Sequence, residues 1–158
     1  MTSKDEIINI SREINDLLSV YVAIHDDVFK FSIRHALPIP GIFKSIDFGS
    51  HIANIEIVAS ALKRHAQRIS MLIARVDREE KDYLSLLLQY AFALIETGDR
   101  FETVLKALYA KSQSFVNSNY DWKNYKHDLA KYEQSVQAYV TIGEGLNKLF
   151  EKIKRSSN

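Results

Sequence analysis

Large apolar residues recur at alternating steps of three and four along four stretches of the chain. In the first stretch, at about residues 3–35, they are Ile7, Ile10, Ile14, Leu17, Tyr21, Ile24, Val28 and Phe31. Because an α-helix turns once every 3.6 residues, this spacing keeps one face of a helix apolar over its whole length. Asp5 and Glu6 lie near the start, where carboxylates interact favourably with the helix dipole. Pro38 and Pro40 end the pattern, so we expect the first helix to stop before them.

The second stretch shows the same pattern from Ser50, a plausible N-cap, to about residue 76. Its apolar residues are Ile52, Ile55, Ala59, Leu62, Ala66, Ile69, Ile73 and Val76. Asp77 is followed three residues later by Glu80, which resembles a capping box, so the sequence favours a new helix from about 78. The alternative is one long, kinked helix over 50–111, because the boundary contains neither proline nor glycine.

The third stretch covers about residues 78–111. Its pattern comprises Leu84, Leu87, Ala91, Leu94, Gly98, Phe101, Leu105 and Leu108. The pattern passes through Gly98 without a change of phase, although a glycine inside a helix costs about 1 kcal/mol relative to alanine. The alternative ends one helix at Thr97, with Gly98 as its C-cap and Asp99 and Glu102 capping another.

The fourth stretch follows a Ser- and Asn-rich loop at 112–122 and extends to about residue 154. Its pattern comprises Tyr125, Leu129, Tyr132, Val136, Tyr139, Gly143, Leu146, Phe150 and Ile153. The three tyrosines are interpreted as packing at the edges of the helix seam, where a ring is buried and its hydroxyl reaches water. No segment alternates with the period of two that a strand requires. The sequence therefore predicts one all-α domain over 1–158, an elongated antiparallel four-helix bundle with a loop at 36–49.

Composition agrees with a folded, water-soluble domain. Of the 158 residues, 46% are hydrophobic and 26% charged, and the formal net charge is +1. Such a balance provides no overall field to recruit nucleic acid, so a nucleic-acid partner is not expected. The chain has no cysteine, no visible signal peptide and no apolar run near the roughly 20 residues needed to span a bilayer. We expect a cytoplasmic protein.

No motif for catalysis, metal binding or cofactor binding is present. The five histidines, His25, His35, His51, His65 and His127, show neither the paired spacing of a zinc-protease helix nor a Glu-x-x-His motif. Nucleophile elbows, phosphate loops and dinucleotide fingerprints are also missing. An acidic strip on the first helix is interpreted as a solvated face, and it consists of Glu13, Asp16, Asp26 and Asp27. We therefore expect a protein without enzymatic activity, without a metal and without a cofactor, although an enzyme or sensor whose site forms only in three dimensions stays open.

Two further features could contact other molecules. The first is a basic stripe of Lys63, Arg64, Arg68 and Arg75. It could bind the phosphates of an anionic membrane, or it could be a solvated face that pairs with acids on a neighbouring helix. The second is an apolar loop of Ile39, Ile42, Phe43, Ile46 and Phe48. It could cap one end of the bundle, bind a partner or second copy, or insert into a membrane interface.

The segments ALKRHAQRISMLIARVDREEKDYLSLLLQYAFALIETGDR (61–100) and LAKYEQSVQAYVTIGEGLNKLFEKI (129–153) resemble the helical BAR domains of sorting nexins. The resemblance implies long heptad-patterned helices, a dimer, and membrane contact through the basic stripe. The residues themselves favour a helical bundle that binds another protein and self-associates, since long heptad seams suit partner helices.

Overall fold

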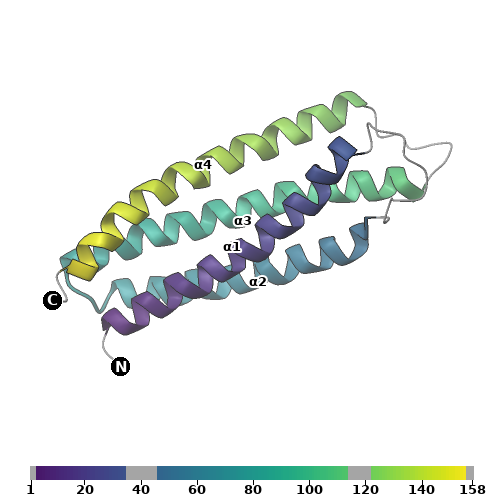
Figure 1. The fold of residues 1–158 in the computed structure, drawn as a ribbon. Helices are drawn as coiled ribbons and strands as arrows, with labels where there is room; N and C mark the ends of the chain where they lie inside the picture. The colour runs from purple at the N-terminus through teal and green to yellow at the C-terminus, as the bar shows by residue number, and fades with distance from the viewer. Residues whose placement is uncertain (1–2, 35–45, 114–121, 156–158) are drawn as a thin grey trace.

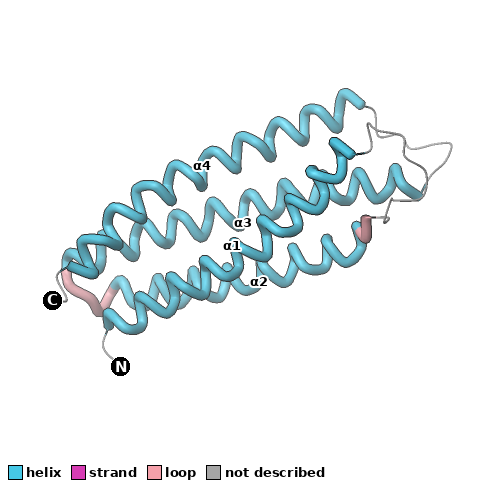
Figure 2. Tube along the Cα trace, in the orientation of Figure 1, coloured by secondary structure: helices cyan, strands magenta, loops and turns pink. Residues whose placement is uncertain are grey.

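The computed structural model describes residues 3–34, 46–113 and 122–155. These residues form four α-helices: α1 (Ser3–Arg34), α2 (Phe48–Ile73), α3 (Arg78–Gln113) and α4 (Trp122–Arg155). Successive helices run in opposite directions along one long axis, and the described part of the chain contains no strand (Figure 1, Figure 2). The prediction of an elongated, antiparallel, all-α four-helix bundle is confirmed.

The turn between α2 and α3 lies where the sequence favoured it. Helix α2 ends at Ile73 and α3 begins at Arg78. The Asp77 carboxylate accepts a hydrogen bond of 3.0 Å from the backbone N–H of Glu80, as the N-terminal residue of a capping box does. A single kinked helix over this region is therefore excluded.

The start of α2 differs from the prediction. The cap is Asp47 and not Ser50, because the Asp47 carboxylate accepts hydrogen bonds of 3.0 Å from the Ser50 backbone N–H and 2.7 Å from the Ser50 hydroxyl. These hydrogen bonds lower the pKa of Asp47. An aspartate at the N-cap satisfies the free N–H groups of the first turn, so the helix begins earlier, at Phe48.

Helix α3 runs through Gly98 without interruption, which excludes the alternative with two caps. A methyl group added at Gly98 would lie 3.9 Å from Ile55 Cγ2, an ordinary van der Waals distance. We expect Gly98→Ala to raise the free energy of unfolding by about 0.5–1 kcal/mol, because alanine loses less backbone entropy on folding. Urea denaturation of the variant measures the change, and a loss of stability would show that this site has no room for a methyl group.

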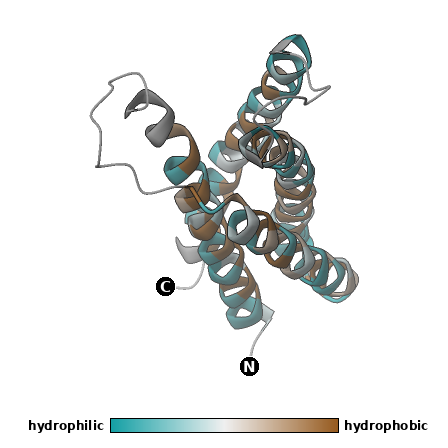
Figure 3. Cartoon of the chain, turned by 90° about the vertical axis from the view of Figure 1, so that its right-hand side faces the viewer, coloured by the Kyte–Doolittle hydropathy of each residue, from teal (hydrophilic) through white to brown (hydrophobic). Residues whose placement is uncertain are grey.

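All four helices turn their apolar faces inward (Figure 3). The core has two clusters, one on each side of the middle of the bundle. The cluster nearer the α2–α3 turn is built around Ile7, Ile10, Ile14, Leu62, Ile69, Tyr83, Leu84, Leu87 and Leu146. The cluster nearer the other end is aromatic and is built around Tyr21, Ile24, Ile55, Phe101, Leu105 and Tyr132.

The four helices are not equally close to one another. Helix α3 packs extensively against α2 and α4, and α1 lies against α2 and α3, but the backbones of α1 and α4 do not approach closely in the described residues. Two glycines let α4 follow α3: a Cβ at Gly143 would lie 3.3 Å from Tyr90 Cε2, and one at Gly145 would lie 3.3 Å from Leu86 Cδ2. The seam between α1 and α4 therefore stays open.

Candidate functional site: the groove between α1 and α4

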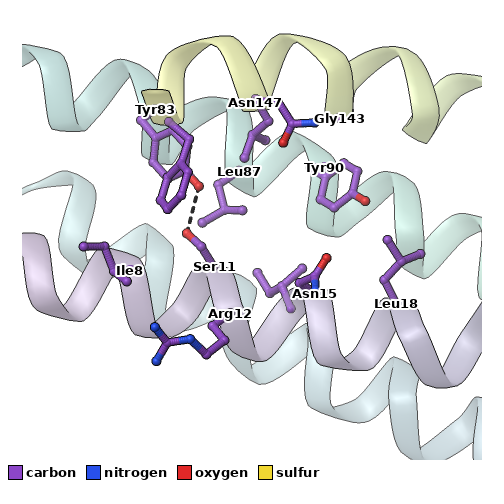
Figure 4. Close-up of a pocket in the computed structure, with 13 residues that line it drawn as sticks. Ile8, Ser11, Arg12, Asn15, Leu18, Tyr83, Leu87, Tyr90, Gly143 and Asn147 are labelled. Carbon is purple, nitrogen blue, oxygen red and sulfur yellow. Dashed lines mark hydrogen bonds between the residues drawn. The ribbon is translucent and has the colours of Figure 1, made fainter. Parts of the chain in front are cut away.

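The open seam contains a groove of about 510 Å³, with α1 and α4 as its walls and α3 as its floor (Figure 4). Its lining from α1 comprises Ile8, Ser11, Arg12, Ile14, Asn15 and Leu18. Its floor and second wall comprise Tyr83, Leu87, Tyr90, Gly143, Leu146, Asn147 and Phe150. Ligand sites in helical bundles commonly form between helices in this way.

The polar groups at the bottom of the groove are held by the protein itself. The Ser11 hydroxyl donates to the Ile7 carbonyl at 2.7 Å and lies 2.8 Å from the Tyr83 hydroxyl. Since serine has only one proton to donate, Tyr83 is the donor in the second hydrogen bond (Figure 4). Burial raises the pKa of Tyr83, so its hydroxyl stays protonated at neutral pH.

Tyr90 supplies a second hydroxyl on the floor. Its ring lies against Gly143 and meets Tyr139 edge to face, with 6.2 Å between ring centroids. Burial raises the pKa of Tyr90 to about 12. Among the described residues that line the groove, only Arg12 carries a charge at neutral pH, and it is exposed. The groove is therefore an apolar channel with neutral hydrogen-bonding groups and one cation at its edge.

Side chains close the seam at one end of this groove. His25 Nδ1 of α1 and the Tyr132 hydroxyl of α4 share a hydrogen bond of 2.6 Å. Beneath it the rings of Tyr132 and Phe101 stack with 4.9 Å between their centroids. Phe29 stacks on both rings at 5.8–6.0 Å. This aromatic cluster fixes how α1 and α4 lie relative to each other along the bundle axis.

Exposed valines extend the apolar lining toward this closed end. Val22 is 41% exposed. It lies one turn after Leu18 and two turns after Asn15, so it is on the same side of α1 as these groove residues. Val140 is 40% exposed and lies about one turn before Gly143 on α4, on the side that faces the groove. Both walls therefore present apolar surface to solvent along the seam.

The basic stripe does not form a single free face. Arg68 lies 3.0 Å from Glu13 and 3.7 Å from Glu6, both on α1. Arg75 lies beyond the end of α2, in the turn that leads to α3. Lys63 and Arg64 are exposed on α2. For Arg68, the alternative of pairing with acids on a neighbouring helix is confirmed.

Two histidines of α2 also face carboxylates of α1. His51 Nε2 donates a hydrogen bond of 2.7 Å to Asp27, and His65 Nδ1 lies 3.5 Å from Glu13 without forming a hydrogen bond. Burial lowers the pKa of His65, an effect that Glu13 partly opposes. The acidic strip is therefore only partly a solvated face, because Glu13 and Asp27 bind α2. No cluster of three or more His, Asp or Glu side chains that could bind a metal occurs among the described residues.

The apolar loop is described only in part. Ile46 and Phe48 are partly buried and pack against the aromatic end of the core. Ile39, Ile42 and Phe43 lie outside the described residues. In the tyrosine series, Tyr132 is fully buried and its hydroxyl bonds His25, so it does not reach water as expected. Tyr125 and Tyr139 are partly buried at the seam edges.

The groove itself was not predicted, although Val22 and Val140 carried a signal. Each is a large apolar residue outside the repeating seam of its helix, where a solvated face is expected to be polar. Comparison with known proteins found no matching family model, no matching curated protein and no matching solved structure. No described helix contains a stretch apolar enough to cross a membrane.

Proposed function

We propose that this protein is a non-enzymatic protein-binding module that accepts an amphipathic α-helix of a partner in the groove between α1 and α4. The observation that carries the proposal is the open seam, in which an apolar floor lies between walls that expose Val22 and Val140. A helix-in-groove interaction uses this kind of surface, because the apolar stripe of the incoming helix completes the interrupted core.

The dimensions of the seam suit a helix. The α1 wall extends from Ile8 to Val22, which at 1.5 Å per residue is about 21 Å, or about four helical turns. Apolar side chains recur along this length, from Ile8 through Leu18 to Val22, and Val22 lies beyond the residues that line the groove. A compact small molecule would leave Val22 and Val140 exposed, whereas a helix of this length covers both.

The chemistry of the lining favours binding over catalysis. An active site needs several convergent ionisable groups within reach of one reacting atom. The groove offers neutral hydroxyls, two asparagines and the exposed Arg12. The BAR-like membrane alternative would use the basic stripe, in which Arg68 is already paired with Glu13. The groove therefore supports the protein-binding function best.

We expect Val22→Asp combined with Val140→Asp to abolish helix binding without unfolding the protein. Helical peptides would first be selected from a displayed library of amphipathic 18-residue sequences with the full chain as target. The affinities of the selected peptides for the unmodified protein and for the double variant would then be measured by fluorescence anisotropy. Each substitution places a charge on the apolar contact, and we expect a loss of at least about tenfold for each, equivalent to about 1.4 kcal/mol.

Val20→Asp is the matched control. Val20 lies on α1 like Val22 and is 45% exposed. It is seven residues from both Glu13 and Asp27, which contact α2, so it lies on the side of α1 that faces α2 and not on the groove side. It should leave peptide affinity unchanged. Equal affinity for the double variant and the unmodified protein, or the absence of any helical binder, would contradict the proposed function.

A further inference from the structure

Two asparagines interrupt the apolar lining of the groove, one on each wall. Asn15 belongs to α1 and Asn147 to α4, and both line the groove (Figure 4). Asn15 lies seven residues before Val22, and Asn147 lies seven residues after Val140. Since seven residues are nearly two full turns, each asparagine lies on the same side of its helix as the valine. A helix that covers the two valines and fills the groove therefore also covers the two asparagines.

The asparagines lie at neighbouring levels of the seam. The hydrogen bond between His25 and Tyr132 relates the levels of the antiparallel α1 and α4. Asn15 precedes His25 by ten residues and Asn147 follows Tyr132 by fifteen, so the two are about 7.5 Å apart along the bundle axis. Ser11 lies one turn before Asn15, between these two levels. We call Ser11, Asn15 and Asn147 the polar belt of the groove.

Apolar residues lie at both ends of the polar belt. Toward the α2–α3 turn they are Ile8 and Phe150. Toward the closed end of the groove they are Leu18, Val22 and Val140. The lining is therefore apolar, then polar, then apolar along its length. A helix whose inward stripe has the same order matches this lining in one register.

The amide groups of Asn15 and Asn147 are available to a partner. The structure records no hydrogen bond to either side-chain amide from any residue that it describes. Each amide offers an acceptor oxygen and two donor hydrogens, and both side chains are exposed, so water satisfies them in the open groove. A leucine or valine placed over them would displace this water and leave buried polar groups unpaired, which opposes binding.

We infer that the partner helix carries asparagine or glutamine at two successive positions in the middle of its apolar stripe. This inference rests on the proposed function and specifies the partner's chemistry. Successive stripe positions are three or four residues apart, or about 4.5–6 Å, and they lean alternately toward the two walls. One such residue therefore faces Asn15 and the other faces Asn147. Two amides can pair because each has a donor and an acceptor.

Charge does not provide a comparable rule for the partner. Arg12 lines the groove, but it is exposed and its long side chain can stay in water beside a bound helix. Asp5 lies two turns before Arg12 and Asp16 one turn after it, so the charges on this side of α1 are mixed. A partner carboxylate over the polar belt would lose its hydration, whereas a neutral amide loses less.

Three amphipathic peptides of 18 residues test the inference. The first has leucine at every stripe position, and the second has asparagine at the two middle positions. The third has the same two asparagines moved to one end of the stripe. We expect the unmodified protein to bind the second peptide about three- to tenfold more tightly than either of the others, because only the second meets the polar belt while its ends stay apolar.

The double variant N15L/N147L should reverse this order. Its groove is apolar on both walls, so the leucine-only peptide should bind at least about tenfold more tightly than the peptide with central asparagines. Both substitutions lie at exposed positions, and an unchanged helical circular dichroism spectrum checks that the bundle is intact. Asn54→Leu is the matched control, because Asn54 is an exposed asparagine on α2, away from the described groove lining, and it should leave the order unchanged.

The outcomes separate this inference from the proposed function. Binding that requires Val22 and Val140 but is equal for the three peptides, or tightest for the leucine-only peptide, would overturn the asparagine rule and leave the groove as a helix-binding site. An order of affinities that N15L/N147L fails to change would have the same meaning. Failure of all three peptides to bind in a manner that depends on Val22 and Val140 would count against both.

Discussion

Replacing Phe101 with alanine will lower the free energy of unfolding by about 3–5 kcal/mol. The Phe101 ring is fully buried and lies at the centre of the aromatic cluster that joins α1, α3 and α4. It stacks on Tyr132 at 4.9 Å and meets Tyr21 edge to face at 5.5 Å. The truncation leaves a cavity surrounded by stiff rings, which cannot move inward to fill it. Urea denaturation followed by circular dichroism measures the loss.

Phe92→Ala is the control for this experiment, because Phe92 lies on the same helix and is 55% exposed. Its substitution should change the free energy of unfolding by less than about 0.5 kcal/mol. If Phe101→Ala and Phe92→Ala gave similar small losses, the aromatic cluster would not be the packed centre that the structure shows.

Raising the pH above about 10, the ordinary pKa of tyrosine, will destabilise the bundle steeply. Burial raises the pKa values of Tyr21, Tyr83 and Tyr132 above this value. In the unfolded chain these groups ionise near pH 10, whereas the folded chain keeps their protons. The stabilising contribution is therefore complete below pH 10 and is lost as the pH rises through the raised values. Between its ordinary and its raised pKa, each such tyrosine removes about 1.4 kcal/mol of stability per pH unit, so the three together remove about 4 kcal/mol per pH unit.

The prediction can be checked by following phenolate absorbance and helical circular dichroism together between pH 8 and 12.5. One group of tyrosines should ionise near the ordinary pKa of tyrosine, and a second group should ionise only as the helical signal disappears. Tyr90, whose pKa burial raises to about 12, belongs to the second group. Ionisation of all the tyrosines near pH 10 with the helices intact would contradict the burial of these hydroxyls.

The helices and their inner faces could be predicted because each depends on residues close together in the sequence. A step of three or four places Ile7, Ile10 and Ile14 on one face of α1 regardless of what covers that face. The Asp77 cap acts over three residues and was also predictable. At the start of α2 local chemistry does not separate Asp47 from Ser50, because a carboxylate and a hydroxyl are both suitable N-cap groups.

The groove could not be predicted because it depends on distances between helices. The apolar pattern shows which side of α1 faces inward but not whether α4 closes over it. Whether α4 closes over α1 depends on Gly143 and Gly145, whose lack of a side chain allows α4 to lie close to α3. It also depends on bulky rings beneath the seam, such as those of Tyr83 and Tyr90. The pairing of Arg68 with Glu13 likewise depends on how α1 and α2 lie against each other.

The two walls of the groove come from the first and the last helix of the described chain. During translation Val22 leaves the ribosome long before Val140 is added, so a nascent chain has no groove until α4 has been made. A partner that recognises both walls would thereby distinguish chains in which α4 has formed from those in which it has not. By joining the two least connected helices, such a partner would also slow the release of α1 from the bundle.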